Sequence, residues 1–380
     1  MIMLFLCLSI FALFPLADCS TKNTNDVSYN RRHIKVILDL HPIGNNFPLG
    51  TEAFKDCPVQ RNCELITDKP RMNVSDAVVV KLPPMFRSIN MIINDIANSD
   101  ARKPDQYWVF VTHEPPTIFD HQHKPLDMLN NFFNLTMTYR TDSDIVTPYG
   151  WFERIENPVE GIKVSFLNEQ KNKSPEPWSF EHKTRMVAWA VSHLNRPSGR
   201  DEYVKELQKY IPVDIYGKQE ESLTLSNQRA VMKQELSRYK FYLAFENSIC
   251  KDYVTEKAFR SLNDEVGAIP VVMGAADYAR VLPPRSYIDV RDFSSPKELA
   301  DHLYKVTSNK TLFDEYHLWR QTYQVKEQHQ RVNHCALCAL LHQLPRGARI
   351  TRNISEWYGT EQSCITHQEY FQGTQGTYLK

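Results

Sequence analysis

Residues 241–274 read FYLAFENSICKDYVTEKAFRSLNDEVGAIPVVMG, and this stretch decides the fold class. Residues 241–245 form a short apolar, aromatic-rich run, which predicts a buried strand, and residues 269–274 predict a second strand that ends at a turn. Between them, Thr255 is a favourable N-cap for a helix over the helix formers that follow it. The order strand, loop, helix, strand is typical of a parallel sheet in an α/β domain.

Parallel sheets of this kind bind ligands beyond the carboxyl ends of their strands. The polar residues at that place are Glu246, Asn247, Tyr253, Thr255, Glu256 and Lys257. The free amides of the helix start and Lys257 suit a diphosphate, and Glu256 can accept hydrogen bonds from both hydroxyls of a ribose. Together these groups predict a nucleotide-sugar site, although each one alone is also typical of a core aromatic or a solvated helix turn.

The chain has 380 residues, a length that suits two domains, and 42% of them are hydrophobic, which is enough for ordinary cores. The formal net charge is zero. This balance indicates neither a nucleic-acid partner nor an anionic membrane surface. A protein that binds a nucleoside diphosphate needs only a local basic cluster.

The first half of the chain is also predicted to be α/β. Apolar runs at 34–38, 77–80 and 107–112 predict buried strands, and helix-length segments such as 85–97 separate them. Glu114 follows the third run directly, where an α/β sheet carries its chemistry. Pro115 disfavours helical geometry at Glu114 and holds it on an extended turn, although a lone glutamate before two prolines is more often a surface turn.

Further along, residues 132–139, 186–192 and 213–217 predict strands. Apolar residues with helical spacing predict a helix near 203–211, and Ser295 opens a capping box for another helix with proline at its first position. After about residue 345 the pattern is weak, and we expect a loosely packed or disordered tail.

The N-terminus opens with fifteen apolar or small residues, 2–16. As a helix they would span about 22 Å, short of the ~30 Å hydrocarbon core of a bilayer. Residues 17–19 resemble a small-x-small cleavage site. A cleaved signal peptide and a short signal anchor therefore both remain open, and either one sends the chain into the secretory pathway. Residues 18–33 are polar and predict a short stem.

Glycosylation sequons and cysteines agree with that route. The sequons begin at Asn73, Asn134, Asn172, Asn309 and Asn353. Cys57 and Cys63 form one close pair and Cys335 and Cys338 another, while Cys250 and Cys364 are left over. A CxxC pair is also typical of half a zinc site or a redox motif, but the gap between Cys57 and Cys63 is a poor zinc spacing.

The runs FYLAFENS (241–248), DYVTEK (252–257), IPVVMG (269–274) and LPPRSYIDVRDFSSPKELADHLYKV (282–306) closely resemble the donor-binding domain of the α1,3-fucosyltransferases. The resemblance extends upstream through NLTMTYRTDSDIVTPYGWF (134–152) and covers roughly residues 34–345. It implies an inverting, GDP-fucose-dependent enzyme of GT-B architecture, with two Rossmann-like domains that face a central cleft. The implied divisions are signal segment 1–17, stem 18–33, acceptor domain 34–170, linker 171–182, donor domain 183–345 and tail 346–380.

The resemblance also implies residue roles. Glu114 matches the proposed general base, with Pro115 where the family usually has serine, and Arg200 matches an arginine that contacts the donor diphosphate; His193 stands where the family usually has asparagine. Glu256 would hold the ribose, Tyr253 would pack near the donor, and Glu246 and Asn247 would position the sugar or diphosphate. The family pattern also implies disulfides that join the two N-terminal cysteines of the catalytic region to Cys335 and Cys338.

The implied reaction transfers L-fucose from GDP-fucose to a hydroxyl of N-acetylglucosamine in a glycan, with an α1,3 linkage expected. No cofactor is implied, and a divalent cation would at most stimulate the enzyme, because Arg200, Lys257 and the helix amides would stabilise the leaving GDP. The implied partners are GDP-fucose, the glycan acceptor and the Golgi membrane, with a type II orientation, or secretion if the N-terminus is cleaved. The alternatives are a metal-dependent glycosyltransferase that uses Asp142 and Asp144, and a non-catalytic lectin-like protein.

Overall fold

The computed structural model describes residues 34–42, 48–82, 102–120, 126–155, 176–217, 229–327, 333–345 and 352–372. The expected signal segment and stem, the helix expected over 85–97, the sequon at Asn172 and the first five residues of the predicted linker, 171–175, lie outside these residues. None of the described helices combines the length and the apolar character that a bilayer-crossing helix needs.

In the part of the chain that the structure describes, six parallel strands form a first sheet in the order β2-β1-β3-β4-β5-β6. The strands are β1 (Lys35–Asp39), β2 (Cys63–Ile66), β3 (Ala77–Lys81), β4 (Tyr107–Thr112), β5 (Leu135–Thr138) and β6 (Ile145–Val146). Every residue of β3 and β4 is buried, as expected for central strands of a parallel sheet that is covered on both faces. The predicted strands of this half are therefore confirmed.

A second parallel sheet, again within the described residues, has the order β13-β12-β10-β8-β9. The strands are β8 (Arg185–Val191), β9 (Val213–Gly217), β10 (Tyr239–Phe245), β12 (Ile269–Met273) and β13 (Ile288–Asp289). In both sheets the first strand lies between the second and the third, so each chain path reverses direction at that point. The reversal falls between β1 and β3 in the first sheet and between β8 and β10 in the second. Such a reversal is where doubly wound α/β folds bind ligands.

Helices cover both faces of the second sheet. One face packs against α3 (Arg200–Leu207) and α7 (Pro296–Ser308), and the other packs against α5 (Glu256–Leu262). Ser295 caps α7 as predicted, because its side chain accepts a hydrogen bond from the Glu298 amide. The remaining helices here are α4 (Arg229–Leu236), α6 (Tyr278–Val281), α8 (Lys310–Glu315), η5 (Phe180–His182), η6 (Val290–Asp292) and η7 (Leu318–Gln321).

The first sheet is covered partly by helices from the end of the chain. Leu337 and Leu341 of α9 (His334–Gln343) pack on one face, and Ile354 and Tyr358 of α10 (Ile354–Tyr358) belong to the core on the other. The predicted donor domain, 183–345, thus contributes α9 to the core of the first sheet. Shorter helices complete this half: η1 (Thr51–Phe54), η2 (Lys69–Val74), α2 (Thr117–Asp120) and η3 (Leu126–Leu129).

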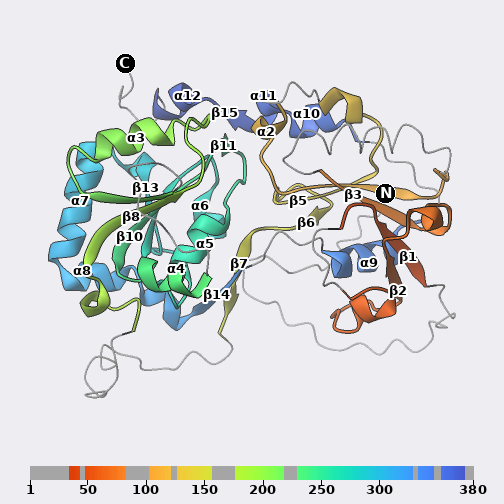
Figure 1. Cartoon of the computed structure of the whole chain (residues 1–380), viewed down its shortest axis with the longest axis horizontal. Coiled ribbons are helices and arrows are strands. Elements are labelled where there is room, and N and C mark those ends of the chain that lie inside the picture. Colours follow the sequence, from red (N-terminus) through yellow and green to blue (C-terminus); the bar gives the residue numbers. More distant parts are fainter. Residues whose placement is uncertain are drawn as a thin grey trace, which may run out of the picture. The chain divides into compact units, whose positions relative to one another are not determined.

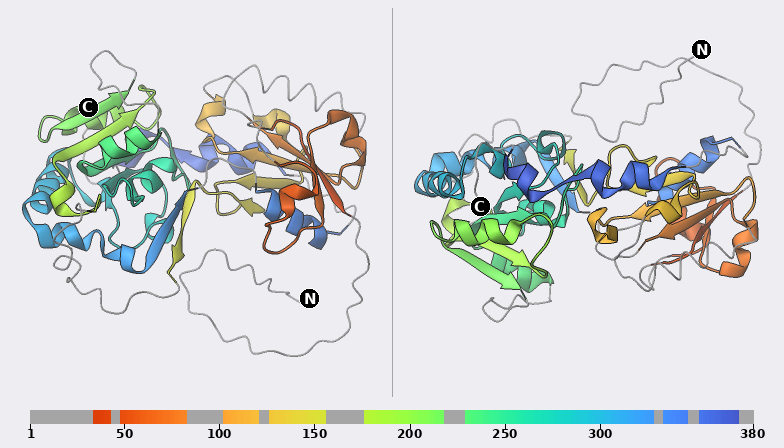
Figure 2. Two further views of the ribbon diagram at one scale, coloured as in Figure 1. Left: turned by 60° about the horizontal axis from the view of Figure 1, so that its bottom comes forward. Right: turned by 90° about the horizontal axis from the view of Figure 1, so that it is seen from above.

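The expectation of a loose tail after residue 345 is wrong for residues 352–372, which we call the C-terminal segment. It contains α10, α11 (Thr360–Ser363), β15 (Cys364–Ile365) and α12 (His367–Gln372). It runs from the first sheet to the second, as all views of Figures 1 and 2 show. Tyr358 packs in the core beside the first sheet, while Phe371 stacks on Tyr203 of α3 at 5.4 Å.

Two short antiparallel pairs and three disulfides tie distant parts of the chain together. Among the described strands, β11 (Ile249–Cys250) pairs with β15, and β7 (Gly150–Arg154) pairs with β14 (Tyr323–Glu327). Disulfides join Cys57 to Cys335 and Cys63 to Cys338, which confirms the implied links. The two remaining cysteines of this region, Cys250 and Cys364, also form a disulfide, which anchors the C-terminal segment beside β10.

Candidate functional site

The loop after β10 is organised by a buried carboxylate. Glu246 follows β10 directly and is only 1% exposed. Its carboxylate accepts hydrogen bonds from the Thr255 amide at 2.8 Å, from the Thr255 hydroxyl, and from Lys257 Nζ at 2.9 Å. Thr255 does occupy the N-cap position of α5, but its side chain does not cap the helix, because the buried Glu246 carboxylate takes its hydroxyl instead. Glu246 thus positions Thr255 and Lys257.

Lys257 is the cation of this group. Its side chain is 15% exposed, and its Nζ contacts Glu246 Oε2 at 2.9 Å and Thr255 Oγ1 at 2.6 Å. Burial lowers the pKa of Lys257, but the nearby Glu246 and Glu256 carboxylates outweigh burial and raise it above its usual value. The lysine therefore stays charged at neutral pH.

Glu256, the first residue of α5, lies on the solvent side of Lys257. One of its carboxylate oxygens is 3.7 Å from Lys257 Nζ and 3.7 Å from an Arg260 nitrogen. Burial raises the pKa of Glu256, but the two cations outweigh burial and lower it. Its side chain is 37% exposed, so an ionised carboxylate remains accessible here.

Arg200 opens α3 at the edge where β8 and β10 meet, but it is deeply buried. Its guanidinium donates to the carbonyl oxygen of Phe245 at 3.0 Å and to that of His193 at 2.8 Å, while its Nε is buried without a partner. Burial lowers the pKa of Arg200, which nevertheless remains a cation at neutral pH. The arginine braces the backbone just before Glu246.

Asn247 and Tyr253 lie in the same loop with different surroundings. Asn247 is half-buried, and among the described residues its Oδ1 finds no hydrogen-bond partner although it is buried. Tyr253 is buried between two tyrosines of the first half, with ring centroids 4.9 Å from Tyr139 and 6.2 Å from Tyr149. Tyr253 therefore packs between the two halves, and its buried ring is not free to lie on a ligand.

Glu114 follows β4 at the carboxyl edge of the first sheet. Its amide donates to Thr112 Oγ1 at 3.2 Å, and its carbonyl oxygen accepts a hydrogen bond from Tyr358 at 2.5 Å. Burial raises the pKa of Glu114, and the negative charge of Glu256 raises it further. The positive charges of Lys257, Arg196 and Lys81 lower this pKa, but burial outweighs them. The Thr117 hydroxyl, three residues after Glu114, is 2.6 Å from the Ser248 hydroxyl in the loop after β10, so the two strand ends lie near one another. A half-buried carboxylate with a raised pKa suits a general base.

Asp142 and Asp144, whose spacing resembles a metal-binding motif, form ion pairs with basic side chains of the chain. Asp142 accepts hydrogen bonds from Arg140 at 2.7 and 2.8 Å and from Lys251 at 3.0 Å. Burial raises the pKa of Asp142, but these hydrogen bonds outweigh burial and lower it to about 2. Asp144 bonds Thr136 and forms an ion pair with Arg352 at 2.5 Å. Both carboxylates therefore have a structural role as partners of basic side chains.

A different cluster, Cys63, Cys338 and His342, has ligand atoms within 4.8 Å of one another. The two cysteines are joined in a disulfide, so they offer no thiolate, and the half zinc site considered from the CxxC spacing is not formed.

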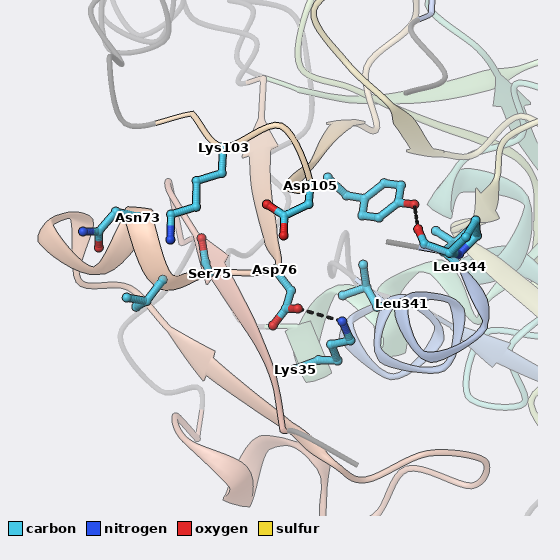
Figure 3. Close-up of a pocket in the computed structure, with 11 residues that line it drawn as sticks. Lys35, Asn73, Ser75, Asp76, Lys103, Asp105, Leu341 and Leu344 are labelled. Atoms are coloured by element: carbon cyan, nitrogen blue, oxygen red, sulfur yellow. Dashed lines mark hydrogen bonds and ion pairs between the residues drawn. The ribbon is translucent and has the colours of Figure 1, made fainter. Parts of the chain in front are cut away.

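A surface pocket of about 140 Å³ lies at the opposite, amino edge of the first sheet (Figure 3). Two of the polar contacts in its lining are made within the protein. Lys35 forms an ion pair with Asp76 at 2.7 Å, and the Tyr107 hydroxyl donates to the Pro345 carbonyl oxygen. Because parallel sheets bind ligands at their carboxyl edges, this pocket is not the candidate site. Asn73, on its rim, is exposed, as are the sequon residues Asn309 and Asn353.

Asn134, by contrast, is buried, and its Oδ1 accepts a hydrogen bond from the Trp108 amide at 2.9 Å. A glycan on this side chain would require Asn134 to leave the folded core.

Sequence reasoning missed several residues around Glu114. Lys81 ends β3, is buried, and acts on the charge of Glu114; a lysine directly after three valines was the available signal. Tyr149 donates to the carbonyl oxygen of His113, and Tyr358 to that of Glu114. Tyr149 lies within a family-like run, but no local signal linked either tyrosine to the base.

Comparison with known proteins finds family profiles that match most of the chain. A profile described as "Fucosyltransferase, N-terminal" matches residues 31–150, and one described as "Glycosyltransferase family 10 (fucosyltransferase) C-term" matches residues 180–357. A crystal structure of an α1,3-fucosyltransferase superimposes with a TM-score of 0.47 at 16% identity, covering 78% of this chain and 84% of that one.

Curated relatives are closer in sequence. The 3-galactosyl-N-acetylglucosaminide 4-alpha-L-fucosyltransferase FUT3 of Homo sapiens is 39% identical over 353 residues, 89% of this chain and 86% of the relative. The 4-galactosyl-N-acetylglucosaminide 3-alpha-L-fucosyltransferase FUT5 of Homo sapiens is 36% identical over 305 residues, 79% of this chain and 74% of the relative. With matching profiles along most of its length and relatives at this level of identity, the chain belongs to glycosyltransferase family 10, the fucosyltransferases.

Proposed function

We propose that this chain transfers L-fucose from GDP-fucose to a hydroxyl of N-acetylglucosamine in a glycan, with inversion and formation of an α1,3 linkage. The observation that carries the proposal is the contact between the loop after β4, which carries Glu114, and the loop after β10, which carries Glu246: the Thr117 and Ser248 hydroxyls are 2.6 Å apart. A base from one sheet and a charged nucleotide-sugar site from the other are the two parts that such a transfer needs.

In the proposed reaction, the acceptor hydroxyl attacks C1 of fucose as Glu114 takes its proton. The bond between C1 and the diphosphate oxygen breaks, and the electron pair leaves with GDP. The raised pKa of Glu114 brings its basicity closer to neutral pH, where a general base is most effective. Attack from the face opposite the leaving group inverts the configuration at C1.

Charge develops on the diphosphate as GDP leaves, and the proposal assigns its stabilisation to Lys257. Glu246 and Thr255 hold the lysine in place, and the exposed carboxylate of Glu256 is available for the ribose hydroxyls. Two nitrogens of Arg200 are already bonded to backbone carbonyls, so this residue does not supply the direct contact. Its positive charge still favours an anion near the loop after β10. We therefore assign the direct contact to Lys257 and a supporting role to Arg200.

The acceptor and linkage follow from the relatives by analogy. Their names share an N-acetylglucosaminide acceptor and an L-fucosyl group, but FUT3 is named for the 4-position and FUT5 for the 3-position. We assign the 3-position because the motifs that first indicated the family are those of α1,3-fucosyltransferases.

The proposal includes GT-B architecture, with the two α/β halves facing a donor-binding cleft, and no cofactor beyond the donor substrate. It also places the enzyme in the Golgi membrane with a lumenal catalytic region, or outside the cell if the N-terminal segment is cleaved. Three disulfides support an oxidising compartment.

The test is transfer from isotopically labelled GDP-fucose to an array of N-acetylglucosamine-containing glycans, with the product linkage read by NMR. We expect transfer to the 3-position, with most activity retained in EDTA. Transfer only to the 4-position would correct the linkage. Loss of all activity in EDTA, restored by a divalent cation, would reject the metal-independent mechanism. Binding of GDP-fucose and glycans without any transfer would reject the enzyme.

A further inference from the structure

The backbone around Glu114 is held by hydroxyl groups from distant parts of the chain. Tyr149 donates to the carbonyl oxygen of His113, and Tyr358, 244 residues away in sequence, donates to that of Glu114 at 2.5 Å. Two consecutive carbonyls are therefore fixed by two tyrosines. We call these two hydroxyls the tyrosine clamp.

Other contacts fix the same turn on its remaining sides. The Glu114 amide donates to Thr112 Oγ1, and Pro115 restricts the backbone that follows. The Thr117 hydroxyl is 2.6 Å from the Ser248 hydroxyl, which belongs to the loop after β10. Within the described residues, the Glu114 carboxylate itself makes no hydrogen bond or ion pair, so the backbone is held while the side chain stays available.

Both tyrosines are themselves rigidly placed. Tyr358 is fully buried and packs edge-on against Phe110 of β4 at 5.6 Å, and Tyr149 packs against His113 at 5.8 Å. The C-terminal segment that carries Tyr358 is fastened by Arg140, which donates to Ser363 Oγ at 2.7 Å, and by the Cys250–Cys364 disulfide. The clamp therefore has little freedom of its own.

We propose that Tyr149 and Tyr358 are positioning residues that aim the Glu114 carboxylate at the acceptor hydroxyl. The proposal rests on the proposed role of Glu114 as the general base. A misplacement of about 1 Å in a reacting group can cost on the order of 10²-fold in rate, so hydrogen bonds to the backbone of the base itself act on kcat. Because both hydroxyls are bonded to backbone carbonyls, we expect their loss to leave donor binding unchanged.

The test compares Tyr358→Phe, Tyr149→Phe and the double variant with Glu114→Gln, all as the full oxidised chain. Each single variant keeps the ring and removes one hydroxyl. We expect kcat to fall about tenfold in each single variant and about 10²-fold in the double variant, with KM for GDP-fucose within about twofold of wild type. Tyr216→Phe is the matched control, because Tyr216 is buried and its hydroxyl bonds Tyr239, away from the site.

The pH profile supplies a readout that a purely structural role would not move. The charged groups facing Glu114 are Lys257 and Glu256 from α5, Arg196 from the loop before α3, and Lys81 from β3. None of these is changed in the variants. When a lost hydroxyl lets the turn relax toward water, burial of the carboxylate decreases, and the acidic limb of kcat moves to lower pH.

The outcomes separate the clamp from the proposed function. If Glu114→Gln loses turnover while both tyrosine variants keep kcat within twofold and an unchanged acidic limb, the clamp is wrong and the base stands. If Glu114→Gln keeps turnover, the base assignment fails whatever the tyrosine variants do. If Tyr358→Phe fails to fold, as judged by the loss of a cooperative thermal unfolding transition, Tyr149→Phe alone decides, and unchanged kcat there overturns the proposal.

Discussion

The first five strands of each sheet follow the same order, but the two sheets prepare their functional residues in opposite ways. After β10, functional side chains bond to one another: Glu246 holds Thr255 and Lys257. After β4, the backbone of Glu114 is held from outside. The difference follows from chemistry, because a cation that binds a diphosphate can keep its own carboxylate partner, whereas a base must keep its lone pairs free to accept a proton. Each prediction below tests one side of this contrast.

The largest effect is expected for Glu114→Gln. The amide keeps the shape and loses the basic lone pair, so kcat should fall by roughly 10²–10⁴-fold while GDP still binds. Steady-state kinetics and calorimetry with GDP measure the two quantities on the same protein. Turnover near that of wild type would remove Glu114 from its role.

Lys257→Ala should damage both binding and folding, since the side chain is one half of a buried pair. Loss of a hydrogen bond to a charged group costs roughly 1.5–3 kcal/mol, so GDP affinity should drop about 10–100-fold, with a higher KM for GDP-fucose and a lower kcat. Glu246 would keep its hydrogen bonds from Thr255 but lose its cationic partner while buried, and breaking a buried ion pair in this way destabilises a fold by about 3–5 kcal/mol.

The double variant Glu246→Gln/Lys257→Met separates these two effects. It removes both charges, so we expect stability to recover in thermal unfolding while GDP binding stays weak. Recovery of GDP affinity together with stability would mean that Lys257 does not contact the diphosphate.

Removal of the Cys250–Cys364 disulfide should loosen the contact that holds the backbone of Glu114 after β4. The loop it closes is long, and loss of such a bond typically costs about 2–4 kcal/mol. In Cys250→Ser/Cys364→Ser we expect a lower Tm and a lower kcat, because the C-terminal segment carries Tyr358. Cys57→Ser/Cys335→Ser is the matched control, with a similar fall in Tm and no fall in kcat for the folded fraction. Equal kcat values in the two double variants would disconnect the segment from the base.

The raised pKa of Glu114 predicts a pH-dependent stability difference. A carboxyl whose folded pKa lies above its unfolded value favours the folded state below the unfolded value, and this contribution is lost as pH rises through the folded pKa. Wild type should therefore lose stability relative to Glu114→Gln as pH rises from about 4 toward 7. Denaturant unfolding at both pH values measures the difference, and a gap that does not change with pH would contradict the burial of this carboxylate.

Asp142→Asn should have the smallest effect on catalysis. The structure pairs Asp142 with Arg140 and Lys251, so the substitution costs some stability and leaves kcat within about twofold. Assays with and without EDTA on this variant check the result. A loss of activity that added divalent cation repairs would restore the metal-dependent alternative.

Much of the fold was predictable because its strands are short apolar runs that end in polar residues. The runs at 77–80, 107–112 and 241–245 all became central strands, and the polar residues after them gathered at the carboxyl edges. Pairing of the cysteines at the two ends of the catalytic region also followed from the family pattern.

The errors came from contacts that no local pattern reports. Thr255 was expected to cap a helix, but a carboxylate nine residues away takes its hydroxyl. The C-terminal segment was expected to be loose because α10, α11 and α12 are too short to show helical periodicity. Their order depends on distant partners, such as Phe133, Arg140 and Cys250.

The C-terminal segment also determines when the site is completed during synthesis. The ribosome makes both parallel sheets before it makes residues 352–372, so a nascent chain that ends at residue 345 already contains Glu114, Glu246 and Lys257. It does not yet contain Tyr358 or the cysteine that bonds Cys250. The nucleotide side of the site can therefore form on the growing chain, whereas the base receives its last contact after the segment has been translated and oxidised.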